Sequence, residues 1–174
     1  FVMVHPSANV EAVATGLVRG AFEYQGQKCS AASRAYIPKS LWNDVKAVME
    51  SQLKTIKMGS PEDPSNFINA VIDKNSFEKC KGYIERAEKS AEANIIFGGK
   101  CNDSKGWFVE PTVIETTNPK YESVCEEIFG PILSVYVYED QDWKETLKLV
   151  DETSPYSLTG SIFSQDRYAI DEAY

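Results

Sequence analysis

The residue with the clearest chemical potential in this sequence is Cys29, which lies within residues 25–34, Gln-Gly-Gln-Lys-Cys-Ser-Ala-Ala-Ser-Arg. Its neighbours are small, so a substrate carbonyl could reach both the sulfur and a backbone N–H. Covalent catalysis by a thiol requires that access. The competing interpretation is a buried structural cysteine, because free cysteines are among the most buried residue types. The small neighbours make the structural interpretation less favoured here than for an arbitrary cysteine, and both interpretations stay open at this point.

A second unusual stretch is residues 124–131, Val-Cys-Glu-Glu-Ile-Phe-Gly-Pro. Glu126 and Glu127 place two carboxylates side by side, and Phe129 adds an aromatic ring just before a Gly-Pro turn. From spacing alone, the sequence favours a helix end that carries two solvated acids.

The other cysteines and the histidine limit the chemistry further. Cys80, Cys101 and Cys125 form no Cys-x-x-Cys pair, and His5 is the only histidine. This pattern does not support a structural zinc site, and we expect no metal. It does not support a cysteine-histidine protease either, because His5 is the only candidate base for Cys29. We expect reduced thiols in an intracellular compartment.

Length and composition describe an ordinary globular domain. The 174 residues suit a single domain over residues 1–174 with a sizeable core. Apolar residues make up 43% of the chain and the net charge is −8, so nucleic acid and membrane surfaces are not expected partners. No apolar run approaches the roughly 20 residues of a membrane span, and no targeting peptide pattern opens the chain. We therefore expect a soluble, intracellular protein.

Strand and helix patterns alternate along the chain. Helices are expected after the candidate N-caps Asn9, Ser40, Asp73 and Asp166, and over residues 143–150. Strands are expected at residues 1–4, 35–37, 95–97, 107–114, 132–138 and 158–163, and the short strand at 95–97 is expected to be buried. This alternation predicts an α/β fold with a largely parallel sheet.

Local residues refine these expectations. Gly26 is expected to end the first helix, and Pro111 argues that the strand over residues 107–114 lies at a sheet edge. Residues 98–100, Gly-Gly-Lys, lack the earlier glycine of a phosphate loop and predict a plain turn. Cys80 falls on the apolar face of its helix and is expected in the core, whereas Cys101 is expected to be exposed.

Four motifs in order resemble the aldehyde dehydrogenase superfamily. Residues 26–29, Gly-Gln-Lys-Cys, are similar to its nucleophile segment, and residues 126–131 are similar to its cofactor-side segment. Residues 108–112, Phe-Val-Glu-Pro-Thr, and residues 158–163, Leu-Thr-Gly-Ser-Ile-Phe, match two further family stretches. The resemblance covers essentially the whole chain. It implies the family's catalytic domain, an open and largely parallel sheet with helices on both faces.

The resemblance assigns roles to the site residues. Cys29 would be the nucleophile, whose thiolate attacks an aldehyde to give a thiohemiacetal and, after hydride transfer to NAD, a thioester that water hydrolyses. Its backbone N–H would help to hold the oxyanion. Ser30 would lie close to the substrate, Glu127 would hydrogen-bond the nicotinamide ribose, and Phe129 would pack against the cofactor.

The charged neighbours of Cys29 leave alternatives open. Lys28 could favour the thiolate form, or it could be an ordinary solvated lysine. Glu11 and Glu23 are the acids nearest to the thiol in sequence, but neither matches the family's general base. We expect both to lie on a solvated helix face.

Finer similarities narrow the expected substrate. Residues 21–24, 29–31, 36–38, 70–73 and 133–138 resemble the eukaryotic 1-pyrroline-5-carboxylate dehydrogenases. These segments imply NAD-dependent oxidation of L-glutamate 5-semialdehyde to L-glutamate in proline degradation, by a homo-oligomeric enzyme of the mitochondrial matrix. The alternatives are an aldehyde dehydrogenase for another semialdehyde, or a non-catalytic module kept for binding or oligomerisation.

The resemblance also implies parts outside this sequence. The general-base glutamate, the oxyanion asparagine and the NAD-binding domain are expected before Phe1, and the loop that holds the substrate carboxylate is expected after Tyr174. The sequence begins directly with a predicted strand and stops inside a predicted helix. We therefore expect a fragment that does not turn over by itself.

Overall fold

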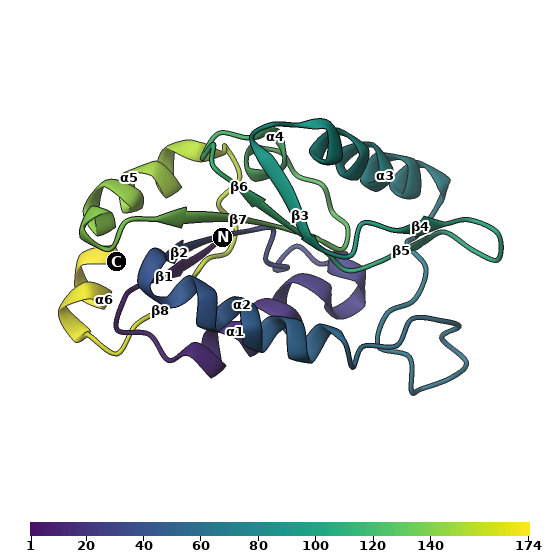
Figure 1. The fold of residues 1–174 in the computed structure, drawn as a ribbon, viewed down its shortest axis with the longest axis horizontal. Helices are drawn as coiled ribbons and strands as arrows, with labels where there is room; N and C mark the ends of the chain where they lie inside the picture. The colour runs from purple at the N-terminus through teal and green to yellow at the C-terminus, as the bar shows by residue number, and fades with distance from the viewer.

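The main sheet of the computed structural model, which describes residues 1–174, has the strand order β3-β6-β7-β2-β1-β8 (Figure 1). Its strands are β1 (Val2–Val4), β2 (Arg34–Pro38), β3 (Ala93–Phe97), β6 (Thr112–Thr116), β7 (Ile132–Tyr138) and β8 (Ser161–Phe163). All neighbouring strands run parallel except β3 and β6. The predicted α/β class with a largely parallel sheet is confirmed.

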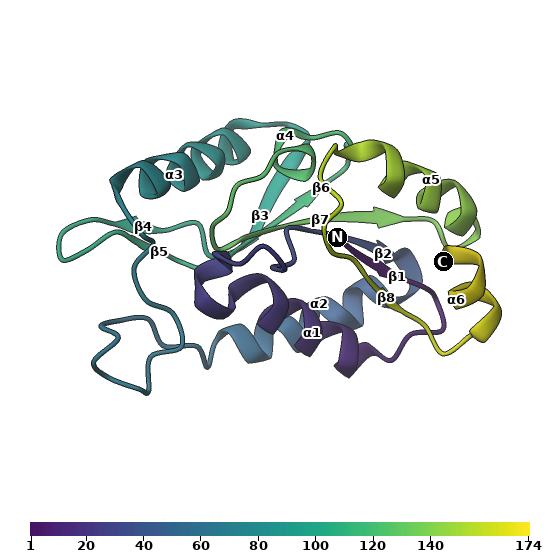
Figure 2. The ribbon, with the colours of Figure 1, turned by 180° about the vertical axis from the view of Figure 1, so that it is seen from behind.

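Helices cover both faces of this sheet, as the resemblance implied (Figures 1 and 2). One face carries α1 (Val10–Phe22) and α2 (Lys39–Leu53). The other carries α3 (Lys74–Lys89), the short α4 (Glu122–Cys125) and α5 (Trp143–Thr153), with α6 (Arg167–Ala173) packed into the same apolar cluster as α5. None of these helices is long and apolar enough to cross a membrane.

Three of the four predicted N-caps are confirmed. The side chains of Asn9, Asp73 and Asp166 accept hydrogen bonds from backbone N–H groups in the first turns of α1, α3 and α6, at 2.8–2.9 Å. Such bonds satisfy N–H groups that a helix start otherwise leaves without a partner. Cys80 on α3 is fully buried, as its position on the apolar face predicted.

The fourth cap, Ser40, was predicted wrongly. Helix α2 begins at Lys39, directly after Pro38, and no side chain of its own caps it. Instead, the backbone N–H of Ser40 donates to Asp140 Oδ1 at 3.0 Å. Asp140 lies just beyond β7, so a distant part of the chain caps this helix. A sequence pattern cannot reveal such a partner.

The predicted end of the first helix was also wrong. Helix α1 ends at Phe22, and a 3-10 turn, η1 (Glu23–Gly26), follows it. Tyr24, Gln25 and Gly26 all have φ values between 55° and 66°. Glu23 leaves the helix with ψ of 131°, which turns the chain before Gly26 is reached.

The region around Pro111 departs from the prediction as well. The expected single strand divides at this proline into β5 (Phe108–Val109) and β6. β5 pairs with β4 (Cys101–Asn102) in a separate ladder, whereas β6 lies inside the main sheet between β3 and β7. Pro111 precedes β6, so the ladder does not require its missing N–H.

Three smaller predictions also differ from the structure. Cys101 was predicted to be exposed, but it is half-buried in β4 against the cluster beneath α3. β3 was predicted to be a buried strand, but it is a half-buried edge strand. β8 is shorter than predicted, covering only Ser161–Phe163. The turn at Gly98 and Gly99, with φ of 72° and 95°, is confirmed.

The cap at α2 generates the first prediction. Asp140→Ala should lower the free energy of unfolding by about 1 kcal/mol, because it removes the acceptor for Ser40 N–H. Ser40→Ala is the matched control and should change stability by less than about 0.5 kcal/mol, because the Ser40 side chain caps nothing. Urea unfolding measures both. A larger loss in Ser40→Ala than in Asp140→Ala would contradict this assignment.

Candidate active site

The candidate site lies at the edge of the sheet where the parallel strands begin. In a parallel sheet the amino ends of neighbouring strands share one edge, and the pairs Val2↔Ala35 and Arg34↔Ser134 place the starts of β1, β2 and β7 there. Residues 27–33 and 126–131 lead into β2 and β7 and therefore meet at this edge. Many open α/β folds bind ligands at the opposite, carboxyl-end edge.

The loop that carries Cys29 is tied down on both sides of the thiol. Ala32 N–H donates to Gly20 O at 2.9 Å, which holds the loop to α1, and Gln27 Oε1 accepts from Ile72 N–H at 2.9 Å. Between these anchors Cys29 and Ser30 are exposed. The backbone N–H of Cys29 makes no hydrogen bond within the chain. Both the thiol and a backbone donor are thus open to an incoming carbonyl.

The segment from Glu126 to Gly130 alternates between anchored and free positions. Glu126 accepts a hydrogen bond from the Tyr83 hydroxyl on α3, Ile128 is buried in the cluster beneath α3, and Gly130 is buried against Cys80. The intervening Glu127 and Phe129 are exposed. The segment does follow a helix end, because α4 ends at Cys125 with Glu126 as its C-cap, and both acids are exposed, as spacing alone favoured; the structure adds that Tyr83 holds Glu126.

The two adjacent acids differ sharply in their surroundings. Burial raises the pKa of Tyr83 to about 12, and the hydrogen bond to Glu126 adds to that rise. The Arg86 guanidinium stacks over the Tyr83 ring at 4.6 Å and donates to Glu122 at 2.7 Å, which secures this part of α3 to α4. The Glu127 carboxylate has no hydrogen bond or ion pair in the chain. It is the acid that remains free to bind another molecule.

Two glycines bring the thiol loop and the Glu127 segment into contact. A Cβ added to Gly26 would lie 2.3 Å from the carbonyl oxygen of Gly130, and Gly26 has φ of +66°. Both the close approach and the left-handed backbone require glycine here. The backbone three residues before Cys29 therefore packs directly on the backbone that follows Phe129.

Phe129 lies on the Glu127 segment with its ring partly open to solvent. Its φ is 58°, which is uncommon for a residue other than glycine, and the side chain is 40% exposed. It lines a cavity of about 450 Å³ together with Tyr24, Gln27 and Lys79. Lys79 Nζ also donates to the carbonyl of Glu127 at 3.3 Å.

Tyr24 and Lys79 are functional candidates that the sequence alone did not reveal. Lys79 directly precedes the buried Cys80 on α3, and its sequence context predicts an ordinary solvated lysine. Only the packing of α3 places it beside Glu127. Tyr24 reads as part of a continuing helix. Neither residue has a sequence signal that points to the cavity.

The charged side chains beside Cys29 pair with one another. Lys28 Nζ binds Glu23 at 2.8 Å, and Arg19 binds the same carboxylate at 2.7 Å. The hydrogen bond from Arg19, followed by that from Lys28, lowers the pKa of Glu23 to about 2. The Lys28 charge is thus engaged by Glu23, which keeps a solvent-accessible position at the end of α1, as expected, but also forms two ion pairs there.

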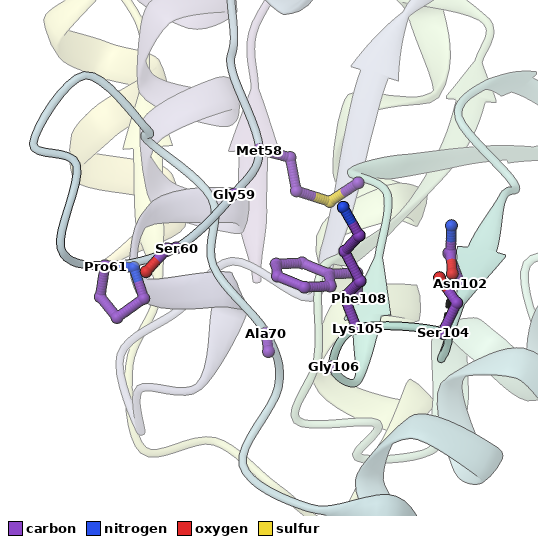
Figure 3. A pocket seen from close by; sticks show the side chains of 10 residues that line it. All are labelled: Met58, Gly59, Ser60, Pro61, Ala70, Asn102, Ser104, Lys105, Gly106 and Phe108. Carbon is purple, nitrogen blue, oxygen red and sulfur yellow. Dashed lines mark hydrogen bonds between the residues drawn. The ribbon is translucent and has the colours of Figure 1, made fainter.

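The largest cavity lies elsewhere. It measures about 600 Å³ between the loop at residues 58–61 and the β4–β5 hairpin (Figure 3). Its side chains include Met58, Phe108 and Lys105, but no thiol, imidazole or carboxylate. Cavity size therefore does not mark the reactive part of this molecule. No group of three His, Cys, Asp or Glu side chains is arranged to hold a metal ion.

Comparison with known proteins gives a consistent result. The model of the aldehyde dehydrogenase family matches residues 1–173. Over 174 residues, the chain is 58% identical to delta-1-pyrroline-5-carboxylate dehydrogenase, mitochondrial, of Dictyostelium discoideum and 52% identical to the protein of the same name of Homo sapiens. These alignments cover 100% and 99% of the chain but 31% of each relative. The chain thus spans about a third of the length of these relatives.

Solved structures agree with these sequence matches. The delta-pyrroline-5-carboxylate dehydrogenase of Mycobacterium tuberculosis superimposes with a TM-score of 0.91 at 41% identity, over 99% of this chain and 31% of that one. A structure of the same protein bound with NAD gives a TM-score of 0.90 at 41% identity, with the same coverage of both chains.

Thiol reactivity tests the placement of Cys29. Burial raises the pKa values of both Cys80 and Cys101 to about 11, so only roughly one thiol in a thousand is ionised at pH 8. Cys29 is exposed and should be alkylated first by iodoacetamide, as mapped by mass spectrometry. Because the raised pKa keeps half-buried Cys101 protonated, its rate should climb about tenfold per pH unit towards pH 11, whereas fully buried Cys80 should react only when the fold opens. Modification of Cys80 or Cys101 ahead of Cys29 would refute this ranking.

The glycine contact gives a second test. Gly26→Ala should destabilise the chain by at least about 1–2 kcal/mol, because it combines a left-handed backbone with a clash against Gly130. Gly20→Ala is the matched control: its Cβ would meet Ala32 Cβ at an ordinary 3.5 Å, within a helix that prefers alanine. Urea unfolding should show a loss in the first variant and no loss in the second. Equal stability of the two variants would rule out the tight contact.

Proposed function

Because this chain belongs to the aldehyde dehydrogenase family, we propose that it is the nucleophile-bearing part of an NAD-dependent aldehyde dehydrogenase. The proposed reaction is the oxidation of L-glutamate 5-semialdehyde, which forms from 1-pyrroline-5-carboxylate, to L-glutamate. The proposal includes residues 1–174 as a single catalytic domain. It assigns Cys29 as nucleophile, Ser30 as a substrate contact, and Glu127 and Phe129 as cofactor contacts.

The observation that carries the proposal is the packing of Gly26 on Gly130. It places an exposed thiol and an exposed carboxylate-aromatic pair on two loops that touch. A nucleophile that forms a covalent adduct and a surface that receives a hydride acceptor have to adjoin for an aldehyde to be oxidised. A buried structural cysteine would have no need of this arrangement.

The chain's own groups support the acyl-transfer half of the reaction. The Cys29 thiolate adds to the aldehyde carbon and forms a thiohemiacetal, and the free backbone N–H of Cys29 is available to the developing oxyanion. Loss of hydride leaves a thioester on the same sulfur, and water hydrolyses it to the carboxylic acid. Ser30 is exposed beside the thiol, where the side chain of the aldehyde would pass.

The residues present fit the nicotinamide end of NAD. Phe129 offers a ring face, and the unpartnered Glu127 carboxylate offers two acceptor oxygens for ribose hydroxyls. Tyr24 and Lys79 extend the same cavity and would add an aromatic wall and a cation. When bound, NAD would accept the hydride that leaves the adduct on Cys29.

Names of relatives support the substrate, the location and the cofactor. The relatives from Dictyostelium discoideum and Homo sapiens are both named mitochondrial, and the Mycobacterium tuberculosis structure contains NAD. These names support a mitochondrial location for the parent enzyme, and we propose the matrix. The homo-oligomer is a proposal that rests on the family resemblance alone. The assay below distinguishes this proposal from its two alternatives, an enzyme for another semialdehyde and a non-catalytic module.

The assay follows NADH absorbance in the full-length enzyme that contains this chain. Cys29→Ala should abolish NADH production from glutamate semialdehyde, because the other thiols beside the Glu127 segment, Cys80 and Cys125, are buried and half-buried. Glu127→Gln should reduce kcat/KM for NAD by roughly 10- to 150-fold, the equivalent of 1.5–3 kcal/mol for a hydrogen bond to a charged group.

The adjacent acid provides the matched control. Glu126→Gln should leave the KM for NAD unchanged, because Glu126 is held by Tyr83. Normal turnover by Cys29→Ala would eliminate the covalent mechanism. A preference for a different aldehyde would correct the substrate alone. The 174-residue chain by itself should give no sustained NADH, and sustained production would overturn the assignment of roles.

A further inference from the structure

Arg34, the first residue of β2, is a buried cation without a partner. Its side chain is only 5% exposed, and its Nε makes no hydrogen bond. None of the molecule's ion pairs includes it. Its guanidinium carbon lies 5.9 Å from the centre of the Phe1 ring, and the side chain lies within reach of the Tyr36 hydroxyl, but these neutral contacts offset little of the cost of burying a charge. A buried charge is normally paired or hydrogen-bonded.

The guanidinium borders a cavity that is open to an additional molecule. This cavity of about 250 Å³ lies beneath α5 and α6, and its walls include Met3, Val150 and Ile162. The walls are mainly apolar, so an ionic contact with Arg34 would be weakly screened.

A second buried donor lies on the same face of β2. Tyr36 is two residues further along the strand, fully buried, and its hydroxyl has no hydrogen-bond partner. Burial raises the pKa of Tyr36, whereas Thr153 and Arg34 oppose that rise, so the phenol remains a hydroxyl donor that senses the Arg34 charge. Tyr36 does not itself line the cavity but lies within reach of Arg34, so the Arg34 guanidinium is the donor that faces the cavity without an acceptor, which points to a missing anion.

We propose that Arg34, supported by Tyr36 behind it, forms a binding subsite for a single carboxylate group. The planar guanidinium fork matches a carboxylate in a two-bond arrangement, and the Tyr36 hydroxyl helps to position the guanidinium. A monoanion fits better than a phosphate dianion, because Asp151 and Glu172 also line the cavity and oppose a second negative charge. Glu172 is engaged by Lys144 at 2.5 Å, and Asp151 forms no ion pair with Arg34.

The subsite is independent of the proposed dehydrogenase activity. It needs no thiol and no cofactor, only a carboxylate small enough to enter. That carboxylate can belong to a free metabolite or to an acidic side chain of the full-length enzyme. Both sources present the same chemistry to Arg34.

Acetate is the probe that tests the subsite in this chain. Thermal unfolding is followed by circular dichroism in 0–50 mM sodium acetate, with sodium chloride added to hold the ionic strength constant. A ligand that binds only the folded state raises Tm, and we expect a rise of about 2–4 °C. Arg34→Gln should abolish the rise, and Arg34→Lys should retain only part of it.

Two further variants keep the test decisive. Tyr36→Phe removes only one hydroxyl and should at least halve the rise, even if Arg34→Gln fails to fold. Arg19→Gln is the matched control: this exposed arginine pairs with Glu23, so its variant should retain the full rise. No acetate effect on the wild-type chain, or an equal effect in the Arg34 and Tyr36 variants, would overturn the proposal.

A parallel arm on the full-length enzyme identifies the source of the carboxylate. An equal rise in Tm with acetate means that the subsite takes a free ligand. No rise, combined with a lower Tm in Arg34→Gln than in Arg19→Gln, means that an acidic side chain of the enzyme fills it. No rise together with an unchanged Tm in Arg34→Gln contradicts the subsite in that enzyme.

Discussion

The contact between the Gly26 and Gly130 backbones is the constraint on which the site depends. A side chain at Gly26 would displace the carbonyl of Gly130, so the two loops can touch only while this position carries no Cβ. The remaining anchors serve the same geometry. Tyr83 and Ile128 hold one loop to α3, and Gly20 holds the other to α1. Two helices on opposite faces of the sheet thereby position a single pair of loops at its edge.

The local chemistry of the site follows from a simple alternation along an extended segment. Side chains that face α3 form a hydrogen bond or pack in the core, and the side chains between them are exposed and make no such contact. Glu126 and Glu127 are identical in type and adjacent in sequence, yet only Glu127 keeps its carboxylate free. The positive charges near the thiol are likewise paired locally, because the Glu23 carboxylate forms ion pairs with both Arg19 and Lys28.

Sequence reasoning succeeded where the cause is local. Apolar periodicity and the caps Asn9, Asp73 and Asp166 depend on neighbours within one turn, and the α/β class follows from their order. It failed where the partner is distant. Asp140 caps α2 from beyond β7, and β6 is enclosed by strands that Pro111 seemed to exclude. Cys29, Ser30, Glu127 and Phe129 were identified by motif resemblance, whereas Lys79 and Tyr24 joined the site only through tertiary packing.

The adjacency of the two loops can be measured directly in solution. A nitroxide attached to Cys29, in a chain whose Cys101 and Cys125 are replaced by serine, broadens the amide signals of nearby residues in NMR spectra. The account predicts strong broadening at Glu127, Ile128 and Gly130, and none at Ser60 or Lys105 beside the large cavity. Unchanged signals at Glu127 and Gly130 would show that the loops do not meet, and would contradict the central claim.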